Sequence, residues 1–362
     1  MTDDAAEPIA LDAGGGRETR IFLGHGLLQE AGRRLFSASG RFLLVSPEPA
    51  RAAAEAIRRS LGARLLADIA LDDREESKNL QTIAAVADRA LAAGLRRDDA
   101  FVAVGGGVAC DVTGFAAAIL LRGVAWNAVP TTTGAMADAA IGGKTGVDHP
   151  AGKNLLGAFH PPRVVLIDPC AAATLAERDF RAGLVEAFKA AWIADASLAG
   201  RAAASLPRIL ARDERALLDL LGGAARVKAS IVSTDLREGG RRRLLNFGHT
   251  LGHALEAAGG YRDLKHGEAV AWGIAAALEI SKRRCGLPDT DVAAVRGVLS
   301  RLGPFPEPRR DPAVISSFLE RDKKATAHGI AAVLLEELGR ARVEESVAPA
   351  EWVAAAAIMS LK

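Results

Sequence analysis

Two parts of the sequence carry polar side chains of the kinds that bind a catalytic metal. Asn246, His249 and His253 are spaced three and four residues apart, so on a helix they would share one face. His266 follows, so three of the chain's seven histidines fall between positions 249 and 266. An isolated buried histidine is more often a core residue, but two imidazoles and a carboxylate form a common zinc site with one position open for substrate. The pattern predicts a catalytic metal.

A carboxylate for such a site lies upstream, in a segment that is otherwise almost entirely apolar. Glu186 and Lys189 are three residues apart between positions 183 and 193. On an exposed helix this pair would contribute only about 0.2–0.5 kcal/mol. A helix that is apolar all round is buried, however, and buried charges are costly unless they are paired or bound to a metal. We therefore predict a functional pair rather than a surface pair.

A glycine-rich turn at residues 105–111 follows an apolar run and opens a helical pattern. Glycine allows close backbone approach and a helix N-terminus favours phosphate, although a tight structural turn would look the same. A second polar turn, residues 130–133, also follows an apolar run. Loops at the carboxyl ends of parallel strands are where such sheets bind ligands. Gly142–Thr145 resembles the end of a phosphate-binding P-loop, but Asp138 occupies the position of its first glycine, so we reject that motif.

The order of elements predicts two domains. Residues 41–46, 100–104, 125–129 and 163–167 read as strands, and residues 50–61 and 79–95 read as helices between them. This alternation indicates an α/β domain with a parallel sheet covered on both faces. Helical patterns dominate after about residue 175, including one from near Gly267 to Gly286, apart from a possible hairpin of residues 330–335 and 342–347.

The predicted architecture is therefore α/β plus all-α. Residues 1–174 would form a Rossmann-like α/β nucleotide-binding domain, and residues 175–362 a mostly helical metal- and substrate-binding domain. We expect the site in the cleft between them. Residues 1 to about 20 are polar and glycine-rich, which is typical of a partly disordered segment. Lys144 and Lys153 are expected on glycine-rich loops, where they could also be solvated surface charges.

Composition narrows the class of protein. The 362 residues are 49% hydrophobic and 25% charged, as in ordinary globular proteins. A net charge of +2 does not suggest a nucleic-acid partner, and basic residues near the predicted site favour a small anionic substrate. Three widely spaced cysteines, no signal-peptide pattern and no membrane-length apolar run lead us to expect a cytoplasmic protein without a membrane partner.

From about residue 20 to the C-terminus, the sequence resembles the 3-dehydroquinate synthases and the wider sugar-phosphate cyclases. The matching stretches occur in order along the chain: residues 105–111, 122–123, 130–132, 138, 142–146, 152–154, 183–189, 228, 237–240, 246–253 and 266–268. The resemblance implies bound NAD, a divalent metal (Zn²⁺ or Co²⁺) and a homodimer. It also implies a substrate, the phosphorylated seven-carbon acid DAHP, which is converted to 3-dehydroquinate and phosphate in aromatic amino-acid biosynthesis by the shikimate pathway.

The resemblance also implies roles for individual residues. The metal ligands would be Glu186, His249 and His266, and His253 would be a nearby active-site residue rather than a ligand. Arg122 matches an arginine that the family can lend across a dimer interface. The substrate-pocket positions are matched by Asp138, Lys144, Asn154, Lys189, Lys228, Arg242, Asn246 and a lysine at 323 or 324. The NAD positions are matched by Asp73, Glu75, Lys78, Gly106, Gly107, Asp111, Thr131, Thr132, Lys144, Lys153 and Thr174.

Several rival functions remain. Aminodehydroquinate synthases have a similar Met-x-Asp-Ala-Ala stretch, here Met136–Ala140. Valiolone-type cyclases act on sugar phosphates that lack a carboxylate, and they tend to change the positions of Arg242 and Asn246, both of which this chain keeps. A metal-dependent polyol dehydrogenase would instead accumulate NADH, whereas the cyclase reaction is redox-neutral. A noncatalytic binding module would bind metal without turnover.

Overall fold

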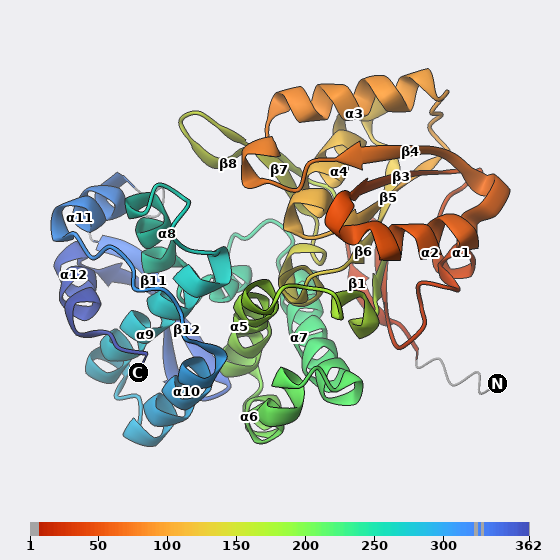
Figure 1. The fold of residues 1–362 in the computed structure, drawn as a ribbon. Helices are drawn as coiled ribbons and strands as arrows, with labels where there is room; N and C mark the ends of the chain where they lie inside the picture. The colour runs from red at the N-terminus through yellow and green to blue at the C-terminus, as the bar shows by residue number, and fades with distance from the viewer. Residues whose placement is uncertain (1–6, 322–324, 327–328, 362) are drawn as a thin grey trace. The chain divides into compact units, whose positions relative to one another are not determined.

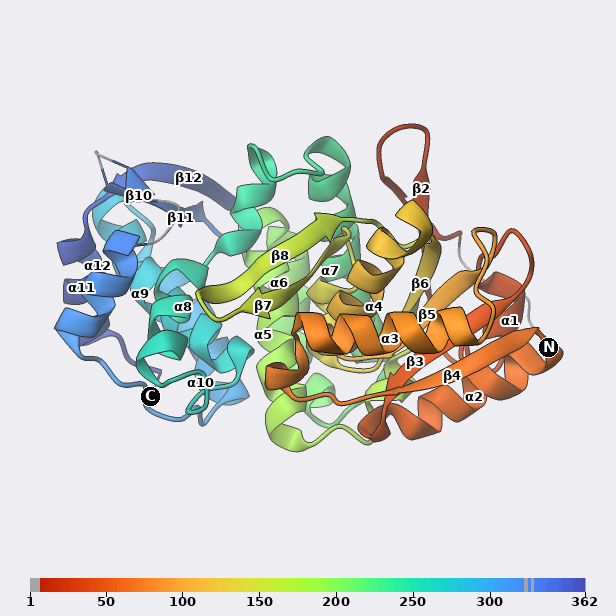
Figure 2. The ribbon, with the colours of Figure 1, turned by 90° about the horizontal axis from the view of Figure 1, so that it is seen from above.

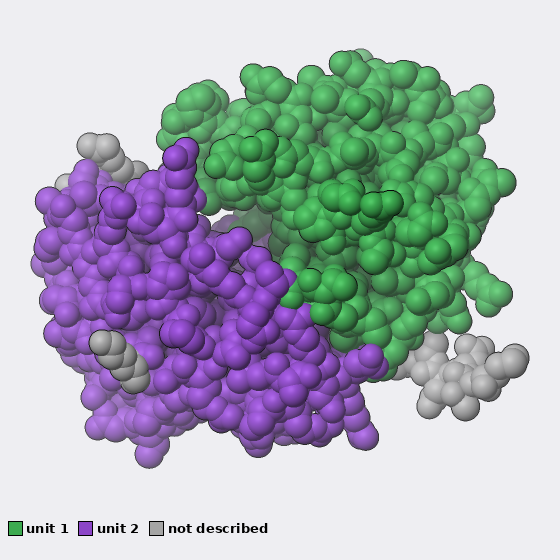
Figure 3. Space-filling model, in the orientation of Figure 1, with its two compact units in different colours: residues 1–175, 228–237 green, residues 176–227, 238–362 purple. Residues whose placement is uncertain are grey.

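The computed structural model describes residues 7–321, 325–326 and 329–361, which form two compact units. Unit 1 comprises Met1–Leu175 with Lys228–Arg237, and unit 2 comprises Ala176–Val227 with Glu238–Lys362 (Figure 3). The helix α7 (Glu214–Thr234) contributes residues to both units. Among the described residues, no helix combines the length and apolar character needed to cross a membrane.

Unit 1 is built on a seven-stranded sheet in which every neighbouring pair but one is parallel (Figure 1). The strand order is β1 (Ile9–Asp12), β2 (Glu18–Leu23), β9 (Val164–Ile167), β6 (Ala125–Pro130), β5 (Ala100–Gly105), β3 (Phe42–Pro47) and β4 (Leu65–Leu71). The central strands are buried along their whole length, which is why they read as continuous apolar runs. The predicted α/β class is confirmed.

Helices cover both faces of this sheet (Figure 1). One face packs on α1 (Ala31–Arg34) and α2 (Arg51–Leu61) through alternate strand residues such as Phe42, Leu44 and Val102. The other face packs on α4 (Gly107–Ile119), which in turn contacts α3 (Leu80–Ala92). This alternation follows from the two-residue period of a strand.

The expectation of a partly disordered N-terminal segment is wrong for the residues the structure describes there. Residues 9–12 and 18–23 form an antiparallel hairpin, and β2 joins the main sheet beside β9. The reason is an alternation within β2, where Thr19 and Ile21 are buried between exposed Glu18 and Arg20. The polar residues of this segment suggested disorder, but they alternate with buried ones in a half-buried strand.

A second hairpin, β7 (Lys144–His149) with β8 (Gly152–Phe159), corrects the expectation of glycine-rich loops around Lys144 and Lys153. Gly146 and Gly157 face each other across it, and a Cβ on Gly146 would lie 2.6 Å from the Leu156 carbonyl oxygen. These glycines therefore serve a close approach of two strands rather than a loop. Lys144, Lys153 and Asn154 are held on strands.

Unit 2 is mainly helical (Figures 1 and 2). Besides its part of α7 it contains α5 (Glu177–Ala194), α6 (Ala196–Leu210), α8 (His249–Ala258), α9 (His266–Cys285), α10 (Asp289–Leu302), α11 (Pro312–Arg321) and α12 (Pro349–Ile358). Strands β10 (Ala325–Thr326), β11 (Gly329–Glu337) and β12 (Arg340–Val347) form a small antiparallel sheet, and β11 packs on α9. The predicted helix ending at Gly286 and the predicted C-terminal hairpin are confirmed.

Helices α8 and α9 approach so closely that glycine is required at their contact. A Cβ on Gly273 would lie 1.8 Å from the carbonyl oxygen of Gly248, and Gly248 itself has a left-handed backbone with φ of 81°. Neither helix can move aside alone, because both are buried over most of their length. This crossing fixes the starts of α8 and α9, which carry His249 and His266.

We expect Gly273→Ala to lower the free energy of unfolding by about 1–3 kcal/mol, the cost of overpacking a tight contact. The matched control is Gly297→Ala in α10, where a Cβ would meet nothing within 4 Å. There the better helix propensity of alanine should stabilise the protein by up to about 1 kcal/mol. Urea unfolding measures both variants, and equal midpoints for the two would contradict the steric argument.

Candidate active site

The helix α5 places a charged pair inside unit 2. Glu186 and Lys189 are 5% and 2% exposed, and the Lys189 ammonium lies against Oε2 of Glu186. The burial predicted from the apolar segment is confirmed. Among the described residues, Oε1 of Glu186 has no hydrogen-bond partner, so the carboxylate keeps lone pairs for a further cation.

Glu186 meets two histidines from the first residues of two other helices. His249 begins α8 and His266 begins α9, and the ligand atoms of the three residues lie within 4.8 Å of one another. Oε1 of Glu186 is 3.8 Å from Nε2 of His249 and 3.6 Å from Nε2 of His266. His249 Nδ1 lies 3.3 Å from the carbonyl oxygen of Phe247. A proton on Nδ1 would then leave the Nε2 lone pair facing the carboxylate, as in metal-binding histidines.

A second buried carboxylate supports His266 from the other side of its ring. Oε2 of Glu256 lies 3.5 Å from Nδ1 of His266, and Glu256 is 4% exposed. Burial alone would lower the pKa of His266, but the carboxylates of Glu256 and Glu186 outweigh it and raise that pKa. The sequence interpretation gave Glu256 no role, although its spacing of three from His253 was the signal that places both on one face of α8.

His253 also lies in this group. It forms a second set of possible ligands with Glu256 and His266, and its ring centroid is 5.3 Å from that of His249. Four imidazole and carboxylate side chains thus surround His266 in unit 2. Their donor chemistry fits a borderline-soft divalent ion such as zinc.

The expectation that Asn246 shares a helix face with His249 and His253 is wrong. Asn246 ends a 3₁₀ helix, η7 (Arg241–Asn246), and the left-handed Gly248 separates it from α8. Its Nδ2 donates a hydrogen bond to Oε1 of Glu238 at 2.7 Å. Arg242, also on η7, is 1% exposed.

In unit 1 the two polar turns lie side by side, as their strand-end positions predicted. Gly106 and Gly107 open α4 after β5, and Thr131 and Thr132 follow β6. The amide of Thr131 donates to the carbonyl oxygen of Gly105 at 2.9 Å. A Cβ on Gly106 would lie 3.1 Å from Cγ2 of Thr132, so the bare backbone keeps this strand edge open.

Two buried lysines link other predicted residues of unit 1. Lys78 Nζ donates to Oδ2 of Asp111 and to Oδ1 of Asn154, both at 2.8 Å. Lys228 Nζ donates to the carbonyl oxygen of Asp138 at 2.6 Å and to its Oδ1 at 2.5 Å. Asp138 lies in a single π-helical turn, Ala135–Ala139, which the sequence reading did not anticipate.

The remaining predicted residues occupy several places in unit 1. Glu75, in the 3₁₀ turn Glu75–Ser77, lies 3.0 Å from Nζ of Lys153. Asp73 follows β4, and Thr174 follows the 3₁₀ turn η6 (Pro169–Ala172). Arg122 lies beyond the opposite end of α4 from Gly107, about 20 Å away along the helix. Lys323 and Lys324 lie outside the described residues.

Burial and the neighbouring charges have opposite effects on the pKa values of Lys78 and Asp111 in unit 1. Burial would lower the pKa of Lys78, but the charges of Asp111 and Glu75 outweigh it and raise that pKa. Burial raises the pKa of Asp111, and Lys78 offsets only part of this. Lys78 therefore stabilises the charged form of the Asp111 carboxylate at this position.

Lys78→Met should lower the free energy of unfolding by roughly 2 kcal/mol, because it leaves Asp111 without its cation. The expected loss is smaller than for a fully buried pair, since the side chain of Asp111 remains 20% exposed. Lys153→Met is the control, because Lys153 and Glu75 are 27% and 41% exposed and such pairs contribute about 0–1 kcal/mol. Chemical denaturation that finds equal losses would show that Lys78 does not stabilise Asp111.

Comparison with known proteins identifies the family. The N-terminal and C-terminal family models of 3-dehydroquinate synthase match residues 68–182 and 183–325. The 3-dehydroquinate synthase of Acidithiobacillus ferrooxidans is 42% identical over 283 residues, 78% of each chain. The chain belongs to the 3-dehydroquinate synthase family. The 3-dehydroquinate synthase of Thermosynechococcus vestitus is 44% identical over 285 residues, 77% of each chain.

Solved structures of cyclases related to the 3-dehydroquinate synthase family share the fold. A 2-deoxy-scyllo-inosose synthase complexed with carbaglucose-6-phosphate, NAD⁺ and Co²⁺ is 26% identical, with a TM-score of 0.85 over 98% of this chain and 100% of that one. A 2-epi-5-epi-valiolone synthase of Streptomyces hygroscopicus with NAD⁺ and Zn²⁺ bound is 29% identical, with a TM-score of 0.85 over 98% of each chain. An iron-containing alcohol dehydrogenase, 14% identical with a TM-score of 0.68, shares the fold alone.

Proposed function

We propose that this protein is a 3-dehydroquinate synthase, which converts DAHP into 3-dehydroquinate and phosphate. The reaction comprises transient oxidation, phosphate elimination, re-reduction and intramolecular aldol cyclisation. The observation that carries the proposal is the convergence of Glu186, His249 and His266, three positions that match the family's metal ligands. The reaction belongs to the shikimate pathway of aromatic amino-acid biosynthesis, and we propose a cytoplasmic homodimer.

Glu186, His249 and His266 would hold Zn²⁺ or Co²⁺ in the mostly helical domain, residues 175–362. Bound NAD would accept and return a hydride, and the metal would act as a Lewis acid on the substrate oxygen. Lys189, buried beside Glu186, would add positive charge where negative charge develops. His253 would move a proton, since an imidazole exchanges protons near neutral pH.

NAD would bind to residues 1–174. Gly106 and Gly107 would let the pyrophosphate approach the N-terminus of α4, where unpaired backbone N–H groups favour an anion. The hydroxyl groups of Thr131 and Thr132, at the neighbouring strand end, would donate hydrogen bonds to the cofactor. We assign further contacts with the cofactor to Asp73, Glu75, Lys78, Asp111, Lys144, Lys153 and Thr174.

The substrate is a dianion or trianion, and the cationic side chains would bind it. Lys144, Lys228 and Arg242 would grip its carboxylate and phosphate, and a guanidinium suits a bidentate hold. Asn154 and Asn246 would add neutral donors, and Asp138 would orient Lys228, to which it is already bonded. We propose that Arg122 serves the other subunit of a homodimer, because it lies at the far end of α4 in its own chain.

The choice among cyclases can be tested by substrate preference. We expect turnover of DAHP with a kcat/KM at least about a hundredfold above that for glucose 6-phosphate, because a buried site built for a carboxylate loses its pairing with a substrate that lacks one. Preference for an amino-substituted DAHP would support the aminodehydroquinate synthase alternative. Preference for the sugar phosphate would overturn the proposal.

A further inference from the structure

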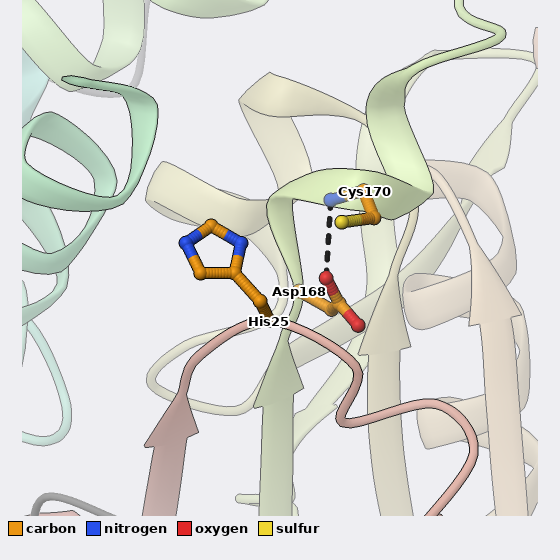
Figure 4. Close-up of side chains that lie close together, drawn as sticks. All are labelled: His25, Asp168 and Cys170. Atoms are coloured by element: carbon orange, nitrogen blue, oxygen red, sulfur yellow. Dashed lines mark hydrogen bonds between the residues drawn. The ribbon is translucent and has the colours of Figure 1, made fainter. Parts of the chain in front are cut away.

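A second group of possible metal ligands lies in unit 1, where two neighbouring strands of the main sheet end. Strands β2 and β9 are parallel, Leu23 pairs with Ile167, and the amide of Gly24 donates to the carbonyl oxygen of Ile167 at 3.2 Å. This register brings His25, just after β2, beside Asp168, just after β9. Cys170 follows on the 3₁₀ turn η6, and Figure 4 shows its thiol and the His25 ring facing each other next to the carboxylate.

The three side chains have the donors and the spacing of a zinc site. A ring nitrogen of His25, a carboxylate oxygen of Asp168 and the sulfur of Cys170 all lie within 4.8 Å of one another. Zinc bonds of 2.0–2.3 Å in a tetrahedral arrangement separate ligand atoms by roughly 3.3–3.8 Å. His25 and Cys170 are exposed, so their side chains can make this small adjustment and a metal ion can reach them.

Asp168 is the fixed member of the group. It is 1% exposed, its Oδ1 accepts the amide of Cys170 at 3.1 Å, and its Oδ2 accepts the amide of Leu28 at 3.5 Å. These bonds hold the carboxylate in one orientation, which reduces the entropy lost when it binds an ion. A capping role accounts for Asp168 alone. It does not account for the imidazole of His25, which approaches this carboxylate and the Cys170 thiol from a separate segment.

We propose that His25, Asp168 and Cys170 bind a divalent transition-metal ion of the zinc class, separate from the ion held by Glu186, His249 and His266. A thiolate and an imidazole select zinc over magnesium or calcium, and water would complete the coordination. The bound ion would tie the loop after β2 to η6, the turn that precedes Thr174. This inference stands independently of the proposed function.

Cobalt provides a selective probe, because this is the only one of the possible metal-binding groups among the described residues that contains sulfur. Titrating metal-free protein with Co²⁺ should produce a thiolate-to-cobalt charge-transfer band. Adding zinc should displace the cobalt and remove the band. Cys170→Ser should abolish the band and remove one bound ion per chain. Cys285→Ser is the matched control, since Cys285 is a partly exposed cysteine that belongs to none of the possible metal-binding groups in the described part of the chain.

The test separates this site from the predicted catalytic one. His249→Ala should retain the charge-transfer band while losing the other ion. His25→Ala should weaken cobalt binding at the sulfur site at least about tenfold, since losing even a residue that only supports a metal ligand typically costs about 10–100-fold in affinity. Absence of any thiolate band in the wild-type protein would overturn the proposal. So would a band that survives Cys170→Ser.

Discussion

His249→Ala should abolish catalytic metal binding and lower kcat/KM for DAHP at least about a thousandfold. A Lewis acid at the reacting oxygen supplies several kcal/mol, and each 1.36 kcal/mol is a factor of about ten in rate. His249 is one of three groups within 4.8 Å, and its loss would leave Glu186 and His266, too few ligands for a tight site. Metal analysis after dialysis and steady-state kinetics measure the two effects.

The fold of the variant should survive. His249 lies at the first turn of α8, and the Phe247 carbonyl oxygen next to its Nδ1 belongs to the same segment, two residues away. His149→Ala, on the exposed turn of the β7–β8 hairpin, is the matched histidine control and should keep its metal. A His249→Ala protein that is free of metal yet fully active would refute the metal assignment.

Arg242→Leu should reduce kcat/KM for DAHP by roughly a hundredfold or more with a smaller effect on stability. Charge-assisted hydrogen bonds contribute about 1.5–3 kcal/mol each, so losing a bidentate hold on an anion accounts for that factor. Removing a buried guanidinium also removes the cost of its desolvation, which offsets part of the stability lost with its contacts. Arg242 is 1% exposed, so this argument applies to it.

The adjacent arginine provides the control for this variant. Arg243 pairs with the exposed Glu345 at 2.6 Å, and such surface pairs contribute about 0–1 kcal/mol. Arg243→Leu should therefore leave kinetics with DAHP nearly unchanged and cost little stability. Kinetics of Arg242→Leu that match those of Arg243→Leu would show that Arg242 does not hold the substrate.

Elements with a strong periodic pattern could be predicted from the sequence. The apolar strands β3, β5, β6 and β9, the end of α9 at Gly286 and the C-terminal hairpin agree with the structure. Where local composition and tertiary context disagree, the prediction failed. The β1–β2 hairpin is polar because only alternate residues face the core. The glycines of β7 and β8 suggested loops, but they allow two strands to approach closely.

The spacing of residues in the sequence predicted only part of the site. Helical spacing joined Asn246 to His249, but the left-handed Gly248 breaks the helix between them, and one residue with positive φ is enough to do so. His266 meets Glu186 because α9 packs on α5 at Gly267, where a Cβ would lie 1.9 Å from the Ala182 carbonyl oxygen, a contact that no local pattern encodes. The positions of the predicted ligands came from the family resemblance, and the separate His25, Asp168 and Cys170 group depends on strand register across more than a hundred residues.

The most direct test is an assay of the purified protein with DAHP, NAD and zinc that follows phosphate, ring product and NADH together. The proposed function predicts phosphate and 3-dehydroquinate in equal amounts with no accumulation of NADH, because the hydride removed from the substrate is returned to it. NADH accumulating without phosphate release would contradict the synthase and identify a dehydrogenase. Binding of NAD and metal without any turnover of DAHP would also contradict it.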